Sequence, residues 1–264
     1  MYSVGMMRKK VLLDKKIGQT PLETLQAWKV AHPKYKNVSA SYAGRLDPMA
    51  SGKLLVLLGE ECKRQKEYIG LDKVYKIEVL LGVGSDTGDV LGIVSASDTH
   101  SVPMKEAVSA VLSEQMGTHT LPYPIFSSKT VAGKPLFLYA LEGTLDAIEI
   151  PVHEETIHSI QKRGLKIISH TELKKRIVSL LALAPTSDEP SKALGADFRI
   201  ADVRTSWEAV FESNRGFCVL SLTVRCGSGT YMRSLAQRIG TSLGTQALAL
   251  SIHRVRLMKP KRRP

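Results

Sequence analysis

The sequence is poor in cysteine and offers no arrangement of residues typical of a metal site. Its three cysteines are an odd number without a Cys-x-x-Cys spacing, which argues against a disulfide framework and a zinc site. The seven histidines are scattered, and even His153 and His158 are five residues apart, not the three or four that place two ligands on one helical face. We therefore expect no bound metal.

Long apolar runs are also missing. No segment approaches the roughly 20 apolar residues that span a bilayer, and residues 1–16 contain no continuous apolar core of a signal peptide. These absences predict a cytoplasmic protein with no membrane partner.

The sequence lacks a dinucleotide-binding fingerprint, although the glycine spacing of one stretch differs from it by only one position. The spacing Gly82-x-Gly84-x-x-x-Gly88 differs from Gly-x-Gly-x-x-Gly, and it runs into Asp86 and Asp89 instead of opening a helix that could bind phosphate. We expect no nucleotide cofactor, and nothing else in the sequence implies an organic one.

Acidic residues are too few to balance the basic ones. The 264-residue chain has 37 Lys and Arg against 25 Asp and Glu, which gives a formal net charge of +12 and a pI near 9.6. Because Lys and Arg neutralise phosphates and release condensed counterions, this balance favours a polyanionic partner. With 43% hydrophobic residues, the chain is globular and long enough for one large domain or two fused halves.

The most informative stretch places a carboxylate in a tight turn. Residues 44–52 are rich in Gly and Pro and precede the apolar run 54–58, so Asp47 would be held in a fixed geometry against a buried strand. Such a setting suits a nucleophile or a base. An aspartate before proline is also a common turn residue, so the dipeptide alone leaves an ordinary turn open.

Two segments alternate between apolar and polar residues, as half-buried strands do. In the segment 74–81, Tyr75 shares a face with the apolar residues at every second position up to Leu81, so it should point toward the interior or a cleft floor. The segment 218–226 alternates in the same way and ends in the glycine-containing turn 227–230.

A helix is expected after this turn. Apolar residues at helical spacing would form its buried stripe: Met232, Leu235, Ala236, Ile239 and Leu243. Arg233 falls in its first turn, and Gly244 could end it.

Two further helices are expected. Residues 20–23 form a capping box with proline at the first helical position, and a second helix should start near Pro103. Apolar residues at helical spacing would form their buried faces: Leu22, Leu25, Trp28 and Ala31, and then Met104, Ala107, Val108, Val111 and Leu112.

Two stretches break this regular pattern. Residues 121–143 combine Pro and Gly with aromatic residues and with the cations Lys129 and Lys134, which predicts a mobile flap. Residues 174–214 join an apolar patch to a segment rich in Ser, Pro, Asp and Gly, which predicts an insertion with a flexible connector.

Four motifs occur together in a fixed order: Ala43–Gly59, Val74-Tyr75, Gly84–Asp89 and Cys226–Arg233. In this order and spacing they resemble the TruB family of pseudouridine synthases, and the resemblance extends over about residues 11–257. It implies an α+β pseudouridine synthase fold, with a central, mostly antiparallel mixed sheet flanked by helices and a cleft across it.

The resemblance also implies a cofactor-independent RNA isomerase, acting on the T-arm uridine at position 55 of tRNA. Asp47 falls at the family's catalytic aspartate and Arg233 at its ionic partner. Tyr75 falls at the tyrosine that stacks under the target base and is proposed to help remove its C5 proton. Taken alone, the residues leave open a surface arginine at a helix start and an ordinary core tyrosine.

Three RNA-binding candidates lie near the N-terminus. Arg45 could pair with Asp47, contact an RNA phosphate or brace the turn. Tyr42 stands five residues before Asp47, where bacterial family members usually carry a histidine. Lys15 belongs to a stretch that resembles a Lys-Pro-x-Gly motif but has Lys16 in the place of proline, which should loosen the turn.

Three more RNA-binding candidates lie further along. Lys129 and Lys134 belong to the stretch 121–143, which matches a family loop that closes over RNA, and Tyr231 belongs to the last motif.

The resemblance suggests that residues 1–264 form one catalytic domain that works as a monomer. The chain ends at Pro264, so we expect no RNA-binding PUA domain such as follows many family catalytic domains. The departures at Lys16 and Tyr42 leave open a noncatalytic RNA-binding or RNA-folding protein, and a synthase for another RNA also remains open.

Overall fold

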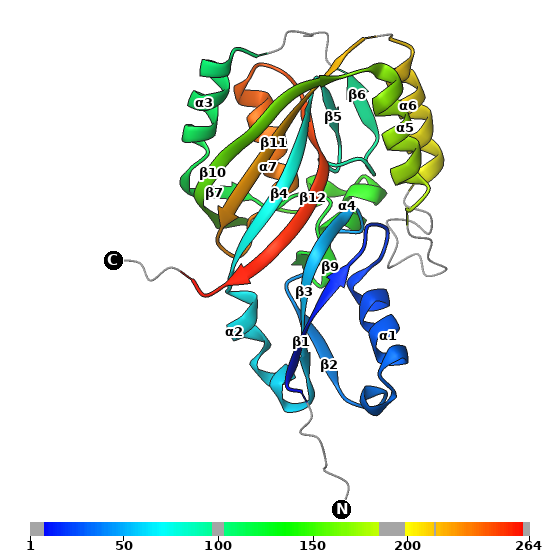
Figure 1. Cartoon of the computed structure of the whole chain (residues 1–264), viewed down its shortest axis with the longest axis vertical. Helices are drawn as coiled ribbons and strands as arrows, with labels where there is room; N and C mark the ends of the chain where they lie inside the picture. Colours follow the sequence, from blue (N-terminus) through cyan, green and yellow to red (C-terminus); the bar gives the residue numbers. More distant parts are fainter. Residues whose placement is uncertain (1–7, 97–102, 185–198, 214, 261–264) are drawn as a thin grey trace, which may run out of the picture.

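The computed structural model describes residues 8–96, 103–184, 199–213 and 215–260 of the chain. Strands, α-helices and short 3-10 helices follow one another in this order (Figure 1): β1 (Lys10–Lys15), α1 (Pro21–Ala31), η1 (Pro33–Tyr35), β2 (Ala40–Ala43), β3 (Ala50–Leu58), η2 (Gly59–Arg64), α2 (Gln65–Ile69), β4 (Asp72–Leu81), β5 (Val83–Ser85), β6 (Val94–Ala96), α3 (Lys105–Glu114), β7 (Gly117–Pro122), β8 (Thr130–Val131), β9 (Lys134–Pro135), α4 (Leu136–Glu142), η3 (Leu145–Ala147), β10 (Val152–Ile168), α5 (His170–Leu181), α6 (Ile200–Phe211), β11 (Phe217–Cys226), α7 (Met232–Ser242) and β12 (Ala247–Met258).

One eight-stranded sheet forms the centre of the protein. Its strand order is β1-β3-β12-β4-β11-β10-β7, and β2 pairs with β3 beside this path. β12 runs parallel to β3 and antiparallel to β4, and the other neighbouring pairs of this sheet are antiparallel. The expected mostly antiparallel mixed sheet is therefore confirmed. The last strand in sequence, β12, joins the N-terminal strands to the rest of the sheet (Figure 1).

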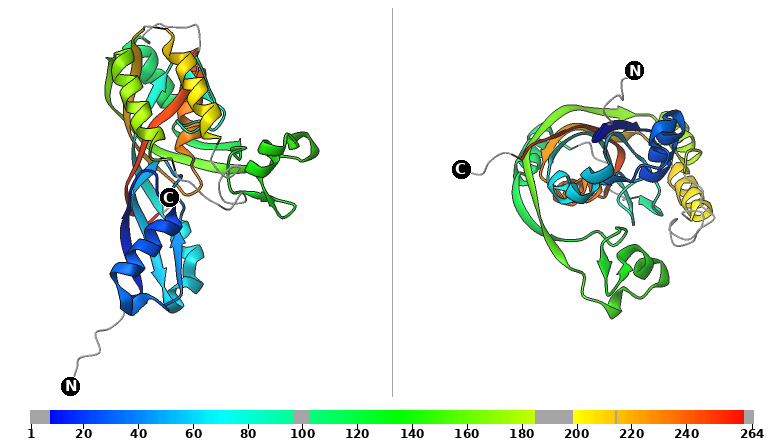
Figure 2. Two further views of the ribbon diagram at one scale, coloured as in Figure 1. Left: turned by 90° about the vertical axis from the view of Figure 1, so that its right-hand side faces the viewer. Right: turned by 90° about the horizontal axis from the view of Figure 1, so that it is seen from below.

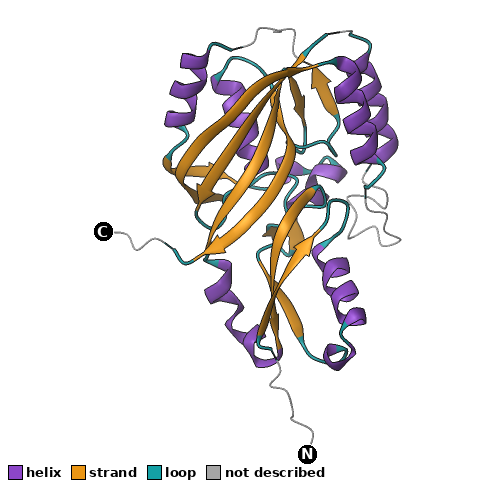
Figure 3. Cartoon of the chain, in the orientation of Figure 1, coloured by secondary structure: helices purple, strands orange, loops and turns teal. Residues whose placement is uncertain are grey.

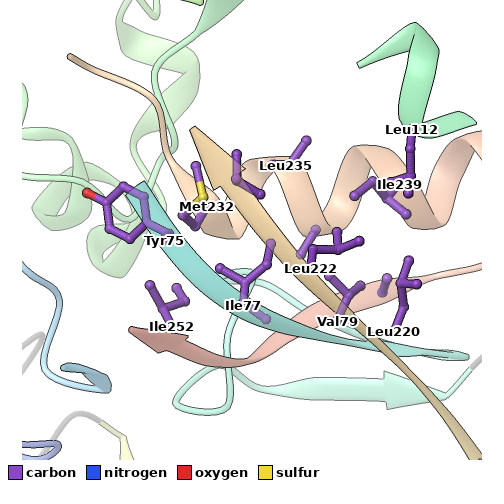
Figure 4. Packing of buried hydrophobic residues seen from close by; sticks show 14 of the residues in the cluster. Tyr75, Ile77, Val79, Leu112, Leu220, Leu222, Met232, Leu235, Ile239 and Ile252 are labelled. Atoms are coloured by element: carbon purple, nitrogen blue, oxygen red, sulfur yellow. The ribbon is translucent and has the colours of Figure 1, made fainter. Parts of the chain in front are cut away.

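Helices cover both faces of the sheet (Figure 3). On one face, α3 and α7 pack over β4 and β11. Tyr75 and Ile77 of β4 belong to the same buried cluster as Leu235 and Ile239 of α7 (Figure 4). Lys76, between Tyr75 and Ile77, is exposed on the opposite side. The alternation expected for this strand is therefore confirmed. The expected glycine at the end of α7 is confirmed as well, because Gly244 follows the helix with a φ of 71°.

The other face is covered at one end by α5 and α6. Trp207 of α6 is 1% exposed, and its indole Nε1–H donates to the Val90 carbonyl at 3.1 Å. Ile177 of α5 is fully buried in the same cluster. Most of α5 and all of α6 fall within the stretch 174–214, and the apolar sides of both helices pack on this face. The expected connector falls on residues 185–198, outside the described residues.

The N-terminal strands carry their own small core. α1 begins with the expected capping box, in which the Glu23 N–H donates to Thr20 Oγ1 at 3.2 Å and the Thr20 N–H donates to Glu23 Oε2 at 2.6 Å. Leu25 is buried here, but Leu22 is 42% exposed and Ala31 is exposed as well. Their expected place in the core is wrong, because the cluster around Leu25 is too small to cover the whole apolar stripe of the helix.

A second correction concerns α3. The helix begins at Lys105, so Met104 is its N-cap residue and is 74% exposed instead of buried. Val108, Val111 and Leu112 are buried, as expected.

Residues 121–143 hold the end of β7, the β8–β9 hairpin and α4. This part projects away from the sheet (Figure 2). Its motion remains a prediction. Among the helices of the described ranges, none combines the length and apolar character needed to cross a membrane.

Candidate active site

Asp47 lies in the turn that joins β2 to β3. The turn is anchored by Leu46 and Met49, which are 5% and 6% exposed, and the Asp47 carbonyl accepts the Ala50 N–H at 3.0 Å. Gly44 enters the turn with a φ of 83°, a left-handed conformation that glycine adopts without strain. The side chain of Asp47 remains 39% exposed. The local sequence therefore fixes the backbone of the turn and leaves the carboxylate accessible.

Arg233, in the first turn of α7, is the ionic partner of Asp47. Its Nε–H donates to Asp47 Oδ2 at 2.8 Å, and its side chain is 5% exposed. The two terminal nitrogens donate to main-chain carbonyls, one to Thr87 and the other to Phe126 at 3.1 Å. A buried guanidinium thus joins the Asp47 turn, the loop after β5 and the projecting segment 121–143.

Asp89 is a second carboxylate beside this guanidinium. Its Oδ2 lies 3.9 Å from Arg233 Nε, and its Oδ1 accepts the Thr87 hydroxyl at 2.9 Å and the Leu91 N–H at 3.0 Å. Burial raises the pKa of the Asp89 carboxyl above its ordinary value. The Arg233 charge opposes this rise, and the Asp47 charge adds to it. Arg233 is therefore placed between two carboxylates of different exposure.

Tyr75 is 7% exposed and lies at the end of the apolar row in β4, near Met232 (Figure 4). Burial raises the pKa of its phenol to about 12. The charge of Arg254 and a hydrogen bond with its side chain oppose this rise, and the charge of Asp47 makes a smaller contribution in the same direction as burial. Tyr75 is consequently a neutral phenol near pH 7. It lies close enough to Asp47 for the charge of that carboxylate to affect its pKa.

Three aromatic rings gather where the projecting segment meets α7. Tyr123 stacks on His153 with ring centroids 4.0 Å apart, and Tyr231 meets His153 edge-on at 5.8 Å. Burial and then the Asp47 charge raise the pKa of Tyr231. Tyr231 is therefore close to the site, supported by two rings for which the sequence predicted no role there.

Lys15 lies beneath the turn and does not face solvent. It is 1% exposed, and its Nζ donates to the carbonyls of Pro48 at 3.1 Å, Ala50 at 2.6 Å and Lys16 at 3.0 Å. Burial lowers its pKa to about 8, against the opposing effect of the Asp47 charge. This position differs from the RNA contact expected for Lys15, because all three donors are already bound to the main chain.

The other two RNA-binding candidates near the N-terminus, Arg45 and Tyr42, differ in their exposure. Arg45 is exposed, and within the described residues its side chain forms no hydrogen bond or ion pair. Tyr42 is half-buried in β2 and packs with the cluster around Leu25 and Tyr35. The structure brings Arg45 to the surface beside Asp47 and turns Tyr42 toward the core under α1.

The two lysines of the projecting segment also differ. Lys129 Nζ lies 4.9 Å from the centroid of the Tyr123 ring, at the aromatic group of the site. Lys134 forms an ion pair with Glu142 and lies over the ring of Tyr139, so its charge is already compensated within the segment.

Two residues that contact the candidate site carry no clear signal in the sequence. Asp89 ends the motif at residues 84–89, but spacing alone does not show that it faces Arg233. Arg254 is 1% exposed and donates to the carbonyls of Gly44, Arg45 and Lys53, which only the pairing of β12 with β3 reveals.

The arrangement suits covalent or electrostatic catalysis by a carboxylate. The Asp47 carboxylate, fixed by a charge-assisted hydrogen bond, can attack an electrophilic carbon or stabilise a developing positive charge. Within the described ranges, no three His, Cys, Asp or Glu side chains are grouped so as to hold a metal ion.

Comparison with known proteins identifies the class to which this fold and site belong. The family model described as "TruB family pseudouridylate synthase (N terminal domain)" matches residues 32–177, which include Asp47, Tyr75 and Asp89. The chain belongs to the TruB family. Arg233 lies outside the matched range.

Similar proteins from several bacteria carry one name. The tRNA pseudouridine synthase B of Azoarcus sp. (strain BH72) is 32% identical over 244 residues, which cover 92% of this chain and 63% of that protein. The protein of the same name from Xanthomonas campestris pv. campestris (strain 8004) is 30% identical over 256 residues, covering 96% and 64%. The chain therefore spans less than two thirds of the length of these curated relatives.

A solved structure shows the same fold. The "Crystal Structure of a Cbf5-Nop10-Gar1 Complex" contains a chain that matches with a TM-score of 0.55 and 18% identity, covering 94% of this chain and 48% of that one. The α+β pseudouridine synthase fold expected from the sequence is confirmed.

Proposed function

We propose that this chain is a pseudouridine synthase that isomerises the T-arm uridine at position 55 of tRNA. Membership of the TruB family supports the reaction, and the name shared by the relatives supports the substrate. The observation that carries the proposal is the 2.8 Å bond from Arg233 Nε to Asp47 Oδ2. RNA binding alone does not require a half-exposed carboxylate held by a buried guanidinium.

The proposed reaction is an isomerisation and needs no co-reactant. The bond from ribose C1′ to uracil N1 breaks, the base turns, and a bond forms from C1′ to C5. The proton on C5 leaves and N1 gains one, so atoms and charge balance. Asp47 acts as the nucleophile or stabilises the sugar while the first bond is broken, and Arg233 orients its carboxylate through the ion pair.

The target base must leave its stack to reach Asp47. Flipping a base out of a folded RNA costs a few kcal/mol, which an aromatic and apolar pocket offsets. We assign Tyr75 as the stacking residue, because it falls at the family's stacking tyrosine and lies at the end of the apolar row in β4, near Met232. Tyr231, supported by Tyr123 and His153, provides a second aromatic surface.

Phosphate contacts are assigned to the exposed Arg45 of the Asp47 turn and to the half-buried Lys129. Arg45 has no partner side chain among the described residues, and Lys129 stands beside the aromatic group. Lys134 would first have to give up its ion pair with Glu142. The net charge of +12 supports RNA as the partner in general.

We further propose that the protein works as a monomer, in the cytoplasm where tRNA is found, without a metal or organic cofactor. One chain supplies all of the proposed site, because the Asp47 turn, β4 and α7 come together within a single sheet-and-helix unit.

The test is nucleotide-resolution mapping of pseudouridine in unmodified tRNA incubated with wild-type protein and with Asp47→Asn. We expect product at the T-arm uridine with wild type only. T-arm hairpins and unrelated stem-loops should be compared in the same assay. Equal turnover of both RNAs would overturn the tRNA assignment, and normal turnover by Asp47→Asn would overturn the mechanism. Tight tRNA binding without product would favour a noncatalytic RNA-binding protein.

A further inference from the structure

Arg254 occupies a position in the sheet that connects two parts of the proposed site. In β12 it pairs with Gly52 of β3 on one side and with Tyr75 of β4 on the other. Gly52 lies a few residues after Asp47. Arg254 therefore stands between the strand that follows the Asp47 turn and the strand that carries Tyr75.

The side chain of Arg254 binds the same turn a second time. It is 1% exposed, and its guanidinium donates through Nε to the Lys53 carbonyl at 2.7 Å and through the terminal nitrogens to Arg45 at 3.2 Å and Gly44 at 3.0 Å. All three acceptors are main-chain oxygens on either side of Asp47. Among the described residues, no carboxylate forms an ion pair with this guanidinium. Its hydrogen bonds serve the backbone of the turn and the side chain of Tyr75.

Close packing supports this connection. Gly52 has a φ of 105°, and a Cβ there would lie 2.2 Å from the Arg254 carbonyl. Only glycine allows the two strands to approach this closely. Pro48 and Ala50 lie a few residues before Gly52, and the carbonyls of both accept a hydrogen bond from Lys15 Nζ. The Asp47 turn is therefore held on both flanks by buried cations that bind main-chain oxygens.

Geometry distinguishes the Arg254 contact from a simple charge effect. A planar guanidinium can donate to three carbonyls in fixed directions, whereas an ammonium on a shorter side chain cannot reach the same three oxygens together. Replacing Arg254 with Lys would keep the positive charge and lose the fixed directions of the three hydrogen bonds. Replacing it with Met would lose both.

We propose that Arg254 is a positioning residue for the isomerisation, which sets the place of the Asp47 carboxylate relative to Tyr75 by holding the Asp47 turn against β4. This role rests on the proposed function. It assigns Arg254 no contact with the RNA. Loss of the contact should therefore change turnover and leave RNA binding intact.

The experiment compares wild type, Arg254→Lys, Arg254→Met and the matched control Arg256→Lys, which changes an exposed arginine two residues later in the same strand. Pseudouridine formation is measured across RNA concentrations on unmodified T-arm RNA, and RNA affinity is measured by filter binding. Each kcat is divided by the fraction of protein that binds RNA in a stoichiometric titration, so that partial unfolding does not pass as lost turnover.

We expect Arg254→Lys to lower kcat by about 100-fold, the effect of a displacement near 1 Å, with KM and the RNA Kd within about threefold of wild type. The control should stay within about twofold. A folded Arg254→Lys variant with wild-type kcat would overturn the positioning role, and so would a loss that appears only in KM and Kd. If Arg254→Met fails to fold, Arg254→Lys carries the test. A wild-type protein that forms no pseudouridine in any RNA would overturn the proposed function, and the positioning role with it.

Discussion

Asp47 and Asp89 face the same guanidinium nitrogen from unequal distances. Arg233 Nε lies 2.8 Å from Asp47 Oδ2 and 3.9 Å from Asp89 Oδ2. Asp89 is buried and Asp47 is 39% exposed, so only Asp47 combines the short contact with access from outside. Asp89 instead compensates part of the buried positive charge.

Arg233→Lys should lower turnover by about 100-fold or more while RNA affinity changes less than threefold, since Lys keeps the charge but cannot bind Asp47 and two carbonyls in fixed directions. The measurement is single-turnover pseudouridine formation at saturating RNA, beside filter binding. Arg204→Lys on the exposed side of α6 is the control and should match wild type. A wild-type rate for Arg233→Lys would show that the guanidinium geometry is unimportant.

The pKa of Lys15 predicts a specific dependence of stability on pH. Burial lowers this pKa from 10.5 to about 8 in the folded protein, so the unfolded chain binds more protons between these values. The free energy of unfolding should therefore gain a contribution of up to about 3 kcal/mol as the pH rises from 8 to 10.5.

Urea unfolding across this pH range should show that rise in wild type and in Lys16→Met, which alters the exposed neighbour. In Lys15→Met the contribution should be absent. Identical pH slopes for the two variants would contradict the buried, perturbed Lys15.

Trp207→Phe should lower the free energy of unfolding by about 2–4 kcal/mol, because it removes buried apolar volume and leaves the Val90 carbonyl without its donor. Urea unfolding followed by circular dichroism measures this loss. Val178→Ala, at a 54% exposed position of α5, should change stability by less than about 0.5 kcal/mol. A small effect of Trp207→Phe would indicate that α5 and α6 are attached only loosely to the sheet.

Arg45→Met should weaken RNA binding severalfold and reduce the slope of log K against log salt by about 1, as the loss of one phosphate contact does. Binding titrations at several salt concentrations measure both values. Lys175→Met, which removes an exposed cation of α5, should leave the slope unchanged. Equal slopes for wild type and Arg45→Met would remove Arg45 from the RNA contacts.

Local patterns in the sequence predicted those parts of the site that a single strand or helix determines. Period-two alternation placed Tyr75 on the buried face of β4, and the helical stripe placed Arg233 in the first turn of α7. The Gly- and Pro-rich composition indicated the turn of Asp47.

Contacts between distant segments were not predictable in this way. Lys15 is buried, and Arg254 reaches the turn, because β1, β3 and β12 are neighbours in the sheet. Leu22 and Met104 show the same limit for helices, since an apolar stripe does not reveal how much of it a neighbouring element covers.

The carbonyl of Phe126 belongs to the projecting segment and accepts a hydrogen bond from Arg233 at 3.1 Å. Moving this segment away would leave one donor of a buried cation without its acceptor, at a cost typical of an unpaired charged group. The guanidinium that orients Asp47 thus also favours one position of the segment. Displacing the segment should consequently weaken the ion pair between Arg233 and Asp47, and disturbing that ion pair should weaken the attachment of the segment.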